Sequence, residues 1–216
     1  MKVFRPIEGL SLIDYLALEQ EMVKTIQEPT LFTWIVSPTV IYGRHQSAEV
    51  EVNEAYCAEH GIAVVQRQSG GGCVYADRGN LMISYIEPSA FSRQYLDSPF
   101  ARFLNLIAQA LQAKGIPAVT TDHNDILVGE KKISGWACYT TPMGTIVHGT
   151  MLFDVNLEAL TRALTPTQEK LYKHGVASVR QRVANLKELA DAFADIHALR
   201  AYIEEYGNKF TCSIDA

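Results

Sequence analysis

One glycine-rich segment combines residue types that could bind an anionic substrate. Arg67 comes two residues before Ser69 and three consecutive glycines, in a stretch that reads RQSGGGCVY from residue 67 to 75. Consecutive glycines are costly in backbone entropy. Their unhindered N–H groups can form a nest around an anion, and an arginine presents a planar fork to phosphate oxygens. The segment predicts an anion site, but a flexible hairpin loop would also explain glycines that match neither the P-loop nor the dinucleotide fingerprint.

A second segment carries two adjacent lysines and reads NDILVGEKKISG from residue 124 to 135. Successive side chains of a strand point to opposite faces, so at most one of Lys131 and Lys132 can face a site. The small Ser134 and Gly135 after Lys132 would permit close approach of a ligand. A lysine on a rigid strand could stabilise the charge that develops when a carboxylate attacks a phosphate. The ordinary alternative is a solvent-facing lysine.

Two further segments carry polar residues in unusual places. His148 stands before Gly149 inside a strand-like run, which indicates either a ligand wall or a partly buried histidine with ordinary hydrogen bonds. Residues 178 to 186, SVRQRVANL, read as a polar loop that enters a helix with Asn185 as its cap.

Patterns of apolar, turn and capping residues predict the elements that would position these segments. The first helix opens at Ser11 with Asp14 completing a variant of the capping box, and a helix over 99–114 has Ser98 as its cap and Gly115 at its end. Gly129-Glu130 is a two-residue hairpin loop. The predicted strands are 31–36, 39–42 (with Ser37-Pro38 as the turn between them), 62–67, 81–86, 118–121, 126–128, 132–139 and 145–153, and further helices are 157–164 and 186–206. Strands and helices mix without a regular β-α-β alternation, which predicts an α+β fold.

The composition sets limits on the class of protein. The chain has 216 residues, of which 48% are hydrophobic, and a formal net charge of -5. These values predict one domain with a small C-terminal extension and argue against a nucleic-acid binder. We expect no membrane span and no signal peptide. The four scattered cysteines lack metal-like spacing, so reduced thiols and a cytoplasmic location are expected.

Taken together and in order, the segments resemble the lipoate–protein ligase A family, part of a larger group with biotin protein ligases and octanoyltransferases. Residues 42–53 are similar to its G-R-x-Q…E-x-N element, and 67–80 to its signature R-R-x-S-G-G-G-x-V-x-H-D-x-G-N. Residues 124–135 are similar to N-D-[IL]…K-[IV]-S-G, 147–152 to H-H-G-T-[LM]-L, and 178–186 to S-V-x-x-R-V-x-N-L. Five ordered elements are far more specific than any single glycine loop.

The resemblance implies an α+β fold of the biotin/lipoate ligase catalytic type, with mixed and antiparallel sheets flanked by helices, similar to class II aminoacyl-tRNA synthetases. It implies a catalytic domain over residues 1–187, with 188–216 forming a C-terminal helix and short tail of the same domain. The implied activity uses ATP and Mg²⁺ to convert lipoate, or a similar short fatty acid, to an acyl-adenylate. The acyl group then passes to a lysine of a lipoyl-acceptor domain, in a 2-oxoacid dehydrogenase complex or the glycine cleavage H protein.

The resemblance also assigns roles to individual residues. Lys132 would be catalytic, contacting both the carboxylate and the α-phosphate. The ATP and adenylate site would comprise Arg67, Ser69, Gly70, Gly71, Gly72, Cys73, Val74, Tyr75, Asn80 and Lys132. Lipoate would contact Gly72, Lys132, His148 and Gly149, and Asp125 would orient a Mg²⁺ ion.

Three positions depart from the family pattern. Gln66 replaces the first arginine of a pair, Ala76 replaces a histidine, and Val147 replaces the first histidine of the pair before Gly149. These changes predict phosphate binding that is either weaker or differently built. The chain also stops at Ala216, where many family members continue into an accessory domain, so a separate accessory subunit is expected for the complete reaction.

Two alternative functions stay open. One is an octanoyl or lipoyl transferase that uses a cysteine thioester and no ATP, but no cysteine lies between 116 and 132 or between 144 and 148, where such a nucleophile is expected. Cys73 and Cys138 are better explained as structural. The other is a non-catalytic lipoate-binding module, against which Arg67 and Lys132 argue.

Overall fold

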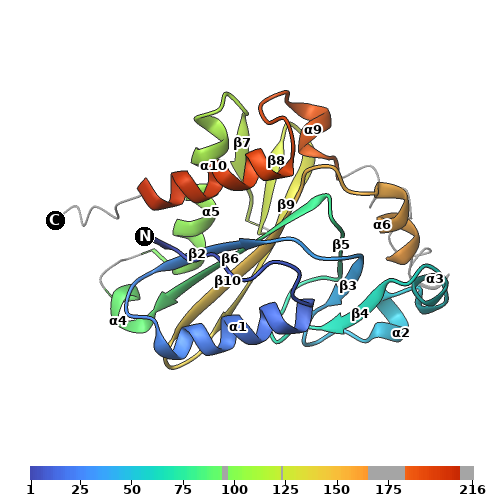
Figure 1. Ribbon diagram of the computed structural model, residues 1–216, viewed down its shortest axis with the longest axis horizontal. Helices are drawn as coiled ribbons and strands as arrows, with labels where there is room; N and C mark the ends of the chain where they lie inside the picture. The colour runs from blue at the N-terminus through green and yellow to red at the C-terminus, as the bar shows by residue number, and fades with distance from the viewer. Residues whose placement is uncertain (94–96, 123, 165–182, 210–216) are drawn as a thin grey trace.

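The computed structural model describes residues 1–93, 97–122, 124–164 and 183–209. Figure 1 shows a large twisted sheet with helices on both sides and a small sheet at one end. The predicted α+β class is confirmed. Helices and strands follow one another without the alternation that a parallel β-α-β fold would require.

The large sheet has seven strands in the order β1-β2-β6-β10-β9-β8-β7. Only the pair β1–β2 is parallel, and all other neighbours are antiparallel. The strands are β1 (Lys2–Val3), β2 (Thr30–Trp34), β6 (Asn80–Pro88), β7 (Ala118–Thr120), β8 (Asp125–Val128), β9 (Lys131–Thr140) and β10 (Gly144–Leu152). The predicted hairpin at Gly129-Glu130 joins β8 to β9, and Gly129 has a positive φ of 59° there.

A second sheet of three strands, in the order β4-β3-β5, holds the glycine-rich segment. It consists of β3 (Thr39–Tyr42), β4 (Ala63–Gln66) and β5 (Val74–Ala76). The predicted strands 31–36 and 39–42 therefore lie in different sheets, although Ser37-Pro38 does separate them. Strand β5 was not predicted, because three residues directly after a run of glycines carry too short a pattern.

Helices α5 (Pro99–Gln112) and α10 (Ile196–Lys209) cover one face of the large sheet. Ser98 caps α5 by accepting from the Ala101 N–H, and Gly115 follows its end with φ 77°, as predicted. The core on this face joins the sheet to both helices through buried residues such as Ile83, Ile107, Val147 and Ile203.

Helix α1 (Leu12–Thr25) covers part of the opposite face, beside the small sheet (Figure 1). The predicted capping box is confirmed: the Asp14 N–H donates to Ser11 Oγ, and the Asp14 carboxylate accepts from the Ser11 N–H. The described fold is completed by the short helices α2 (Ala48–Glu51), α3 (Glu54–Glu59), α4 (Ser89–Ser92), α6 (Leu157–Ala163) and α9 (Leu186–Leu189).

The predicted single helix over 186–206 is wrong, because the chain forms two helices there: α9 (Leu186–Leu189) and α10. Ala190 is extended, and Phe193 turns into the core with 8% of its surface exposed. Asp195 then starts the new helix, since its carboxylate accepts from the Ala198 N–H at 2.8 Å.

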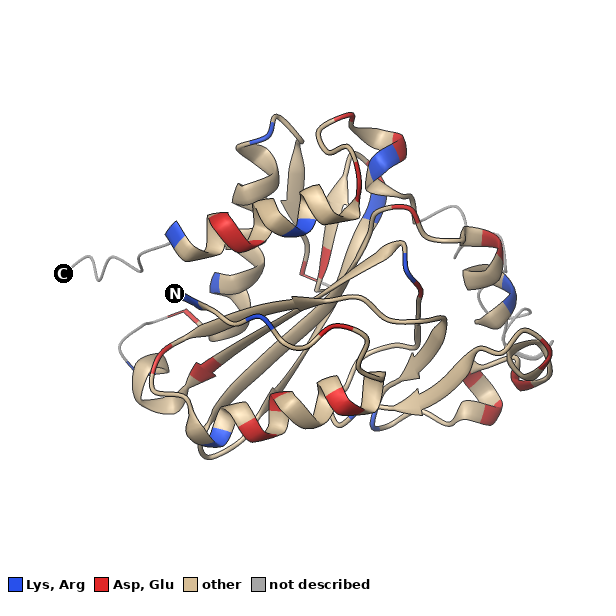
Figure 2. Ribbon diagram, in the orientation of Figure 1, with Lys and Arg blue, Asp and Glu red and all other residues tan. Residues whose placement is uncertain are grey.

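Charged residues of both signs are spread over the described surface (Figure 2). Helices α2 and α3 carry four glutamates and no lysine or arginine, so acidic charge gathers at that end of the molecule. Among the described residues, no helix combines the length and the apolar character needed to span a bilayer.

Candidate active site

The glycine loop between β4 and β5 packs tightly against the end of β3. A Cβ atom built on Gly43 would lie only 2.3 Å from the carbonyl oxygen of Gly71, so these backbones approach as closely as glycine permits. Gly71 has φ 89°, a conformation that other residues rarely adopt. The Arg44 N–H donates to the Ser69 carbonyl at 3.0 Å and fixes the loop from the β3 side. Close packing and backbone hydrogen bonding therefore fix the conformation of the loop, which argues against the flexible-hairpin interpretation.

The Arg67 side chain stabilises this loop through hydrogen bonds. Its guanidinium donates to Ser69 Oγ at 3.0 Å and to the carbonyl oxygens of Gly70 and Gly72 at 2.7 Å each, and it also donates to the Ile41 carbonyl at 3.1 Å. The residue is only 7% exposed, and burial lowers the pKa of its guanidinium. Arg67 therefore fixes the conformation of the glycine loop, and it also lines a cavity beside the loop.

Lys132 and Asp125 form an ion pair where β8 meets β9. Lys132 Nζ lies 2.7 Å from Asp125 Oδ1, and the two side chains are 33% and 23% exposed. A Cβ atom on Gly135 would come within 3.0 Å of Lys132 Cε and Nζ, so the lysine folds back over a position that only glycine leaves open. The amine is thus directed along its own strand, where a small residue makes room for it.

The fourth predicted segment meets Lys132 through the backbone. Val183 forms a bridge with Lys132, and the Ala184 N–H donates to the Lys132 carbonyl at 3.0 Å. Asn185 binds both the N–H and the carbonyl of Val155 and makes no side-chain cap to α9. Residues 178–182 of this segment lie outside the described residues.

His148 links the glycine loop to a buried carboxylate. Its Nε2 lies 2.6 Å from Ser69 Oγ, and its Nδ1 lies 2.9 Å from Oε2 of Glu19, which is 1% exposed. Glu19 also accepts from Ser84 Oγ at 2.6 Å, and Ser84 accepts from Trp34 Nε1 at 2.9 Å. A buried charge needs such partners, so this chain of hydrogen bonds fixes the imidazole in one orientation beside the loop.

These groups surround one cavity of about 180 Å³, several times the roughly 30 Å³ that a water molecule occupies. Its lining divides into three parts. One wall is apolar, formed by Leu12, Leu16, Trp34, Ile41 and Met82, and a second is formed by Arg67 and the loop residues Gly71, Gly72, Cys73 and Val74. The third comprises Asn124, Asp125, Lys132, Gly135, Trp136, Ala137, His148, Gly149 and Thr150.

Nine residues assigned from the sequence line this cavity: Arg67, Gly71, Gly72, Cys73, Val74, Asp125, Lys132, His148 and Gly149. Four others do not: Ser69, Gly70, Tyr75 and Asn80. Asn80 is fully buried and donates to the Tyr75 carbonyl at 3.1 Å, so it ties β5 to β6. Burial raises the pKa of the Tyr75 phenol, which keeps it neutral. Neither residue lines the cavity, and their assigned contact with the nucleotide stays a prediction.

The three departures from the family pattern lie in different surroundings. Gln66 is exposed and donates to the Arg44 carbonyl, and Val147 is fully buried in the core on the α5 face, away from His148. Ala76 is fully buried in the cluster that contains Trp34, Ile41 and Met82. Ala76 thus belongs to the cluster that holds the apolar wall of the cavity, and it makes the surroundings of that wall more apolar than a histidine would.

Sequence reasoning missed the contribution of the N-terminal helix. Leu12 and Leu16 of α1 line the cavity, and Glu19, one turn further on, holds His148. A glutamate on the buried side of an amphipathic helix was the available signal, since such a carboxylate needs a partner. Trp34 was assigned only to a strand, yet its ring forms part of the apolar wall.

Of the three cysteines that the structure describes, only Cys73 lines the cavity. Cys138 lies on β9 next to Ala137 but does not line the cavity, and it is exposed. Desolvation raises the pKa of the Cys138 and Cys57 thiols, which disfavours the reactive thiolate. Cys73 lines the cavity beside Arg67.

The cavity offers one carboxylate, that of Asp125, as a possible metal ligand. Within residues 1–93, 97–122, 124–164 and 183–209, no three His, Cys, Asp or Glu side chains gather as a metal site. Asp125 is a single carboxylate at the cavity. Mg²⁺ commonly binds proteins through one or two carboxylates and takes its other ligands from water and substrate phosphates. Asp125 therefore fits a nucleotide-bound Mg²⁺ and not a resident ion.

Comparison with known proteins places the chain in a family. The model of the lipoyl protein ligase A/B catalytic domain matches residues 12–206, and the chain belongs to this family. It is 35% identical over 193 residues to the lipoate-protein ligase LplJ of Bacillus subtilis, a match that covers 87% of this chain and 56% of that protein. The chain thus spans little more than half the length of this relative.

Two solved structures have the same fold. One is the bi-partite lipoate protein ligase of Thermoplasma acidophilum, studied with its E2 lipoyl domain (TM-score 0.80, 28% identity, 95% of this chain and 81% of that chain). The other is a lipoate-protein ligase A bound with ATP (TM-score 0.79, 26% identity, 95% of this chain and 83% of that chain).

Proposed function

We propose that this protein activates lipoate, or a similar short fatty acid, with ATP and transfers the acyl group to a lysine of a lipoyl-acceptor domain. The observation that carries the proposal is the cavity itself. It brings one amine, Lys132, together with a glycine loop braced by Arg67 and an apolar wall. Family membership and the ATP-bound neighbour support the same reading.

In the first step, a carboxylate oxygen of the acyl acid attacks the α-phosphorus of ATP. A new P–O bond forms, the bond to the β-phosphate oxygen breaks, and pyrophosphate leaves. Lys132 stabilises the negative charge on the carboxylate and the α-phosphate without any proton transfer. The N–H groups of the glycine loop, held in place by Arg67, would bind phosphate oxygens.

In the second step, the neutral amine of the acceptor lysine attacks the acyl carbonyl carbon. The C–N amide bond forms, the C–O bond of the mixed anhydride breaks, AMP leaves, and the amine loses one proton. Lys132 would again lie beside the carbonyl and phosphate oxygens, where charge develops.

The apolar wall suits the acyl chain. Leu12, Leu16, Trp34, Ile41 and Met82 would bury the methylenes, at about 0.8 kcal/mol for each CH₂ removed from water. His148 and Gly149 would bound this part of the cavity, with the imidazole fixed by Glu19 and Ser69.

Asp125 would hold the Mg²⁺ that accompanies ATP, which neutralises phosphate charge when bound. In the ligand-free protein this carboxylate pairs with Lys132. We propose that nucleotide binding redistributes the pair: Lys132 turns toward the α-phosphate while Asp125 stays at the metal.

We extend the proposal to the partners. The Thermoplasma neighbour is bi-partite and is paired with an E2 lipoyl domain. By analogy, the acceptors would be lipoyl domains of 2-oxoacid dehydrogenase complexes or the glycine cleavage H protein, and a separate accessory subunit would assist transfer. The described cysteines are unbridged, which fits a reducing compartment such as the cytoplasm.

Mass spectrometry of a lipoyl-acceptor domain tests this function. The protein is incubated with the domain, ATP, Mg²⁺ and lipoate, with and without a candidate accessory subunit. A lipoyl mass increment on one lysine that requires ATP supports the proposal. ATP-independent transfer from an acylated donor protein would instead identify a transferase.

A further inference from the structure

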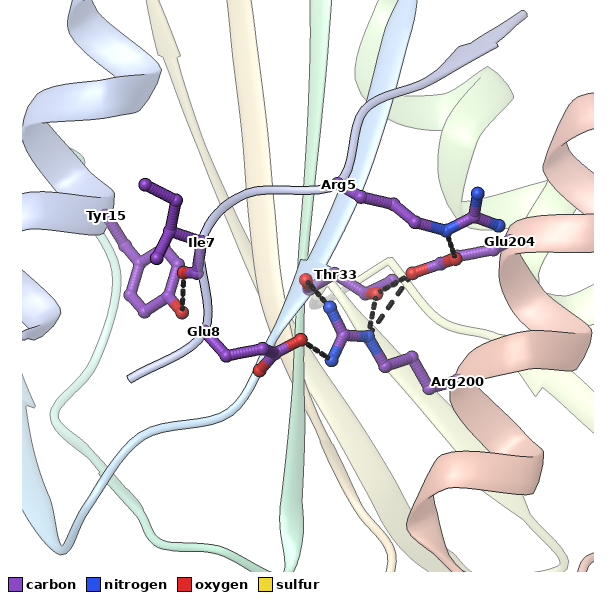
Figure 3. Close-up of polar contacts among 7 residues, drawn as sticks. All are labelled: Arg5, Ile7, Glu8, Tyr15, Thr33, Arg200 and Glu204. Carbon is purple, nitrogen blue, oxygen red and sulfur yellow. Dashed lines mark hydrogen bonds and ion pairs between the residues drawn. The ribbon is translucent and has the colours of Figure 1, made fainter. Parts of the chain in front are cut away.

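A second polar cluster lies where α10 crosses β2 (Figure 3). It is on the sheet face opposite the cavity, because Thr33 and the cavity-lining Trp34 are successive residues of β2. Arg200 Nε donates to Thr33 Oγ1 at 2.8 Å, and Arg200 Nη2 donates to the Thr33 carbonyl at 3.0 Å. Thr33 Oγ1 in turn donates to Glu204 Oε1 at 2.6 Å. Thr33 is fully buried and Glu204 is 5% exposed. Helix α10 therefore binds this strand through a buried network whose polar groups have hydrogen-bond partners.

The same two α10 residues hold the N-terminal segment that precedes α1. Arg5 Nε pairs with Glu204 Oε2 at 2.9 Å, and Glu8 pairs with Arg200 Nη1. Between them, the Ile7 carbonyl accepts a hydrogen bond from the Tyr15 hydroxyl of α1 at 3.2 Å. Figure 3 shows these side chains converging from α10, β2, α1 and the N-terminal segment.

The network reaches the cavity through Trp34. Thr33 and Trp34 are successive residues of β2, so they face opposite sides of the sheet. The Trp34 ring lines the cavity and stacks on Tyr15, with ring centroids 4.5 Å apart and an interplanar angle of 29°. Trp34 is therefore held twice by groups that α10 anchors: through its own strand at Thr33, and through Tyr15 and the N-terminal segment.

We propose that Arg200 and Glu204 are positioning residues for the acyl-binding wall of the cavity. They clamp Thr33 and the N-terminal segment, and this clamp sets the position of the Trp34 and Tyr15 rings. Neither residue touches the substrate. The inference deepens the proposed function and depends on it for the identity of the ligand. It adds that affinity for the acyl chain is controlled from a helix on the other face of the sheet.

Kinetics of four variants test the clamp. Arg200→Gln removes the charge, and Thr33→Val removes the shared hydroxyl while keeping the shape of the side chain. Lys209→Gln is the control, because Lys209 pairs with Glu205 at the exposed end of the same helix. In Arg200→Gln and Thr33→Val we expect the KM for lipoate to rise about tenfold, within the range of couplings between contacting groups. The KM for ATP and kcat should stay unchanged, Lys209→Gln should resemble the parent, and Thr33→Ser should restore the parent KM.

A spectroscopic readout separates this proposal from the proposed function. The chain contains two tryptophans, Trp34 and Trp136, so labelling with 5-fluorotryptophan yields two ¹⁹F resonances, assigned with Trp136→Phe. The clamp predicts that Arg200→Gln and Thr33→Val shift or broaden the Trp34 resonance and leave that of Trp136 in place. This holds even if the parent releases no pyrophosphate. An unchanged Trp34 resonance in both folded variants, or an equal rise of the KM for lipoate and ATP, would overturn the proposal.

Discussion

At the scale of single residues, Lys132 differs from its neighbour Lys131 in what it faces. Lys132 lines the cavity and pairs with Asp125, whereas Lys131 does not line it. We predict that Lys132→Ala lowers acyl-dependent pyrophosphate release by at least about 100-fold, as expected when an electrostatic stabiliser of the transition state is removed. Thermal unfolding should change little, because the lysine is not a core residue.

Lys131→Ala is the matched control, and we expect it to retain parent activity in the same pyrophosphate assay. Equal losses in the two variants would contradict the assignment of Lys132. They would indicate a general effect on β9.

Arg67 supports the nucleotide side of the cavity by holding the carbonyl groups of Gly70 and Gly72. We predict that Arg67→Ala raises the Kd for ATP about 10- to 100-fold, since hydrogen bonds to a charged group are worth about 1.5–3 kcal/mol. The Kd for lipoate should rise less. Arg67→Lys should fail to rescue, because an ammonium cannot reproduce the planar fork.

Separate calorimetric titrations of nucleotide and lipoate measure this difference, and Gln68→Ala, at an exposed neighbouring position, provides the control. A larger effect of Arg67→Ala on lipoate than on ATP would show that the loop serves the acyl end of the cavity.

At the scale of elements, the hairpin of β9 and β10 depends on Gly149. A Cβ atom there would lie 2.4 Å from the Trp136 ring and 2.7 Å from the Gly135 carbonyl. We predict that Gly149→Ala destabilises the fold by about 3 kcal/mol or more, which lowers Tm by roughly 6–12 °C. Gly70→Ala meets no atom within 4 Å, and we expect its Tm to match that of the parent. Thermal denaturation followed by circular dichroism tests both variants, and equal Tm values for the two would refute the packing argument.

The elements also show what the sequence could predict. The start of α1 at Ser11 and Asp14, and the start of α5 at Ser98, are predicted because the caps and the apolar pattern are local. The missed strand β5 and the break between α9 and α10 have non-local causes. β5 exists through its pairing with β3, and the break exists because Phe193 fills the core against Tyr202, with ring centroids 5.4 Å apart.

The same distinction applies to the site. Lys132, Arg67 and the glycine loop are recognisable from motifs, and nine of the assigned residues line the cavity. The apolar wall was missed because Leu12, Leu16 and Trp34 look like ordinary core residues until the tertiary fold brings them beside β10. Ser69, Gly70, Tyr75 and Asn80 belong to the motif but do not line the cavity, so their contact with the nucleotide stays a prediction.

At the scale of the whole molecule, the relation to the bi-partite neighbour leads to a prediction about transfer. We expect the purified 216-residue chain to bind lipoate and to form adenylate slowly, since an accessory part would help to exclude water from the reactive anhydride. Addition of an accessory subunit should speed modification of an acceptor domain by at least about tenfold, the scale of a conformational step that closes the site. Full modification at ordinary turnover by the chain alone would contradict this prediction.

The most direct test of the central claim is acyl-dependent release of pyrophosphate from ATP by the purified protein, with Mg²⁺ present. The claim predicts that lipoate triggers pyrophosphate release together with lipoyl-adenylate, and that both products disappear in Lys132→Ala. If the parent protein binds lipoate but releases no pyrophosphate with or without an accessory subunit, the cavity is not the site of an acyl-activating ligase and the claim is wrong.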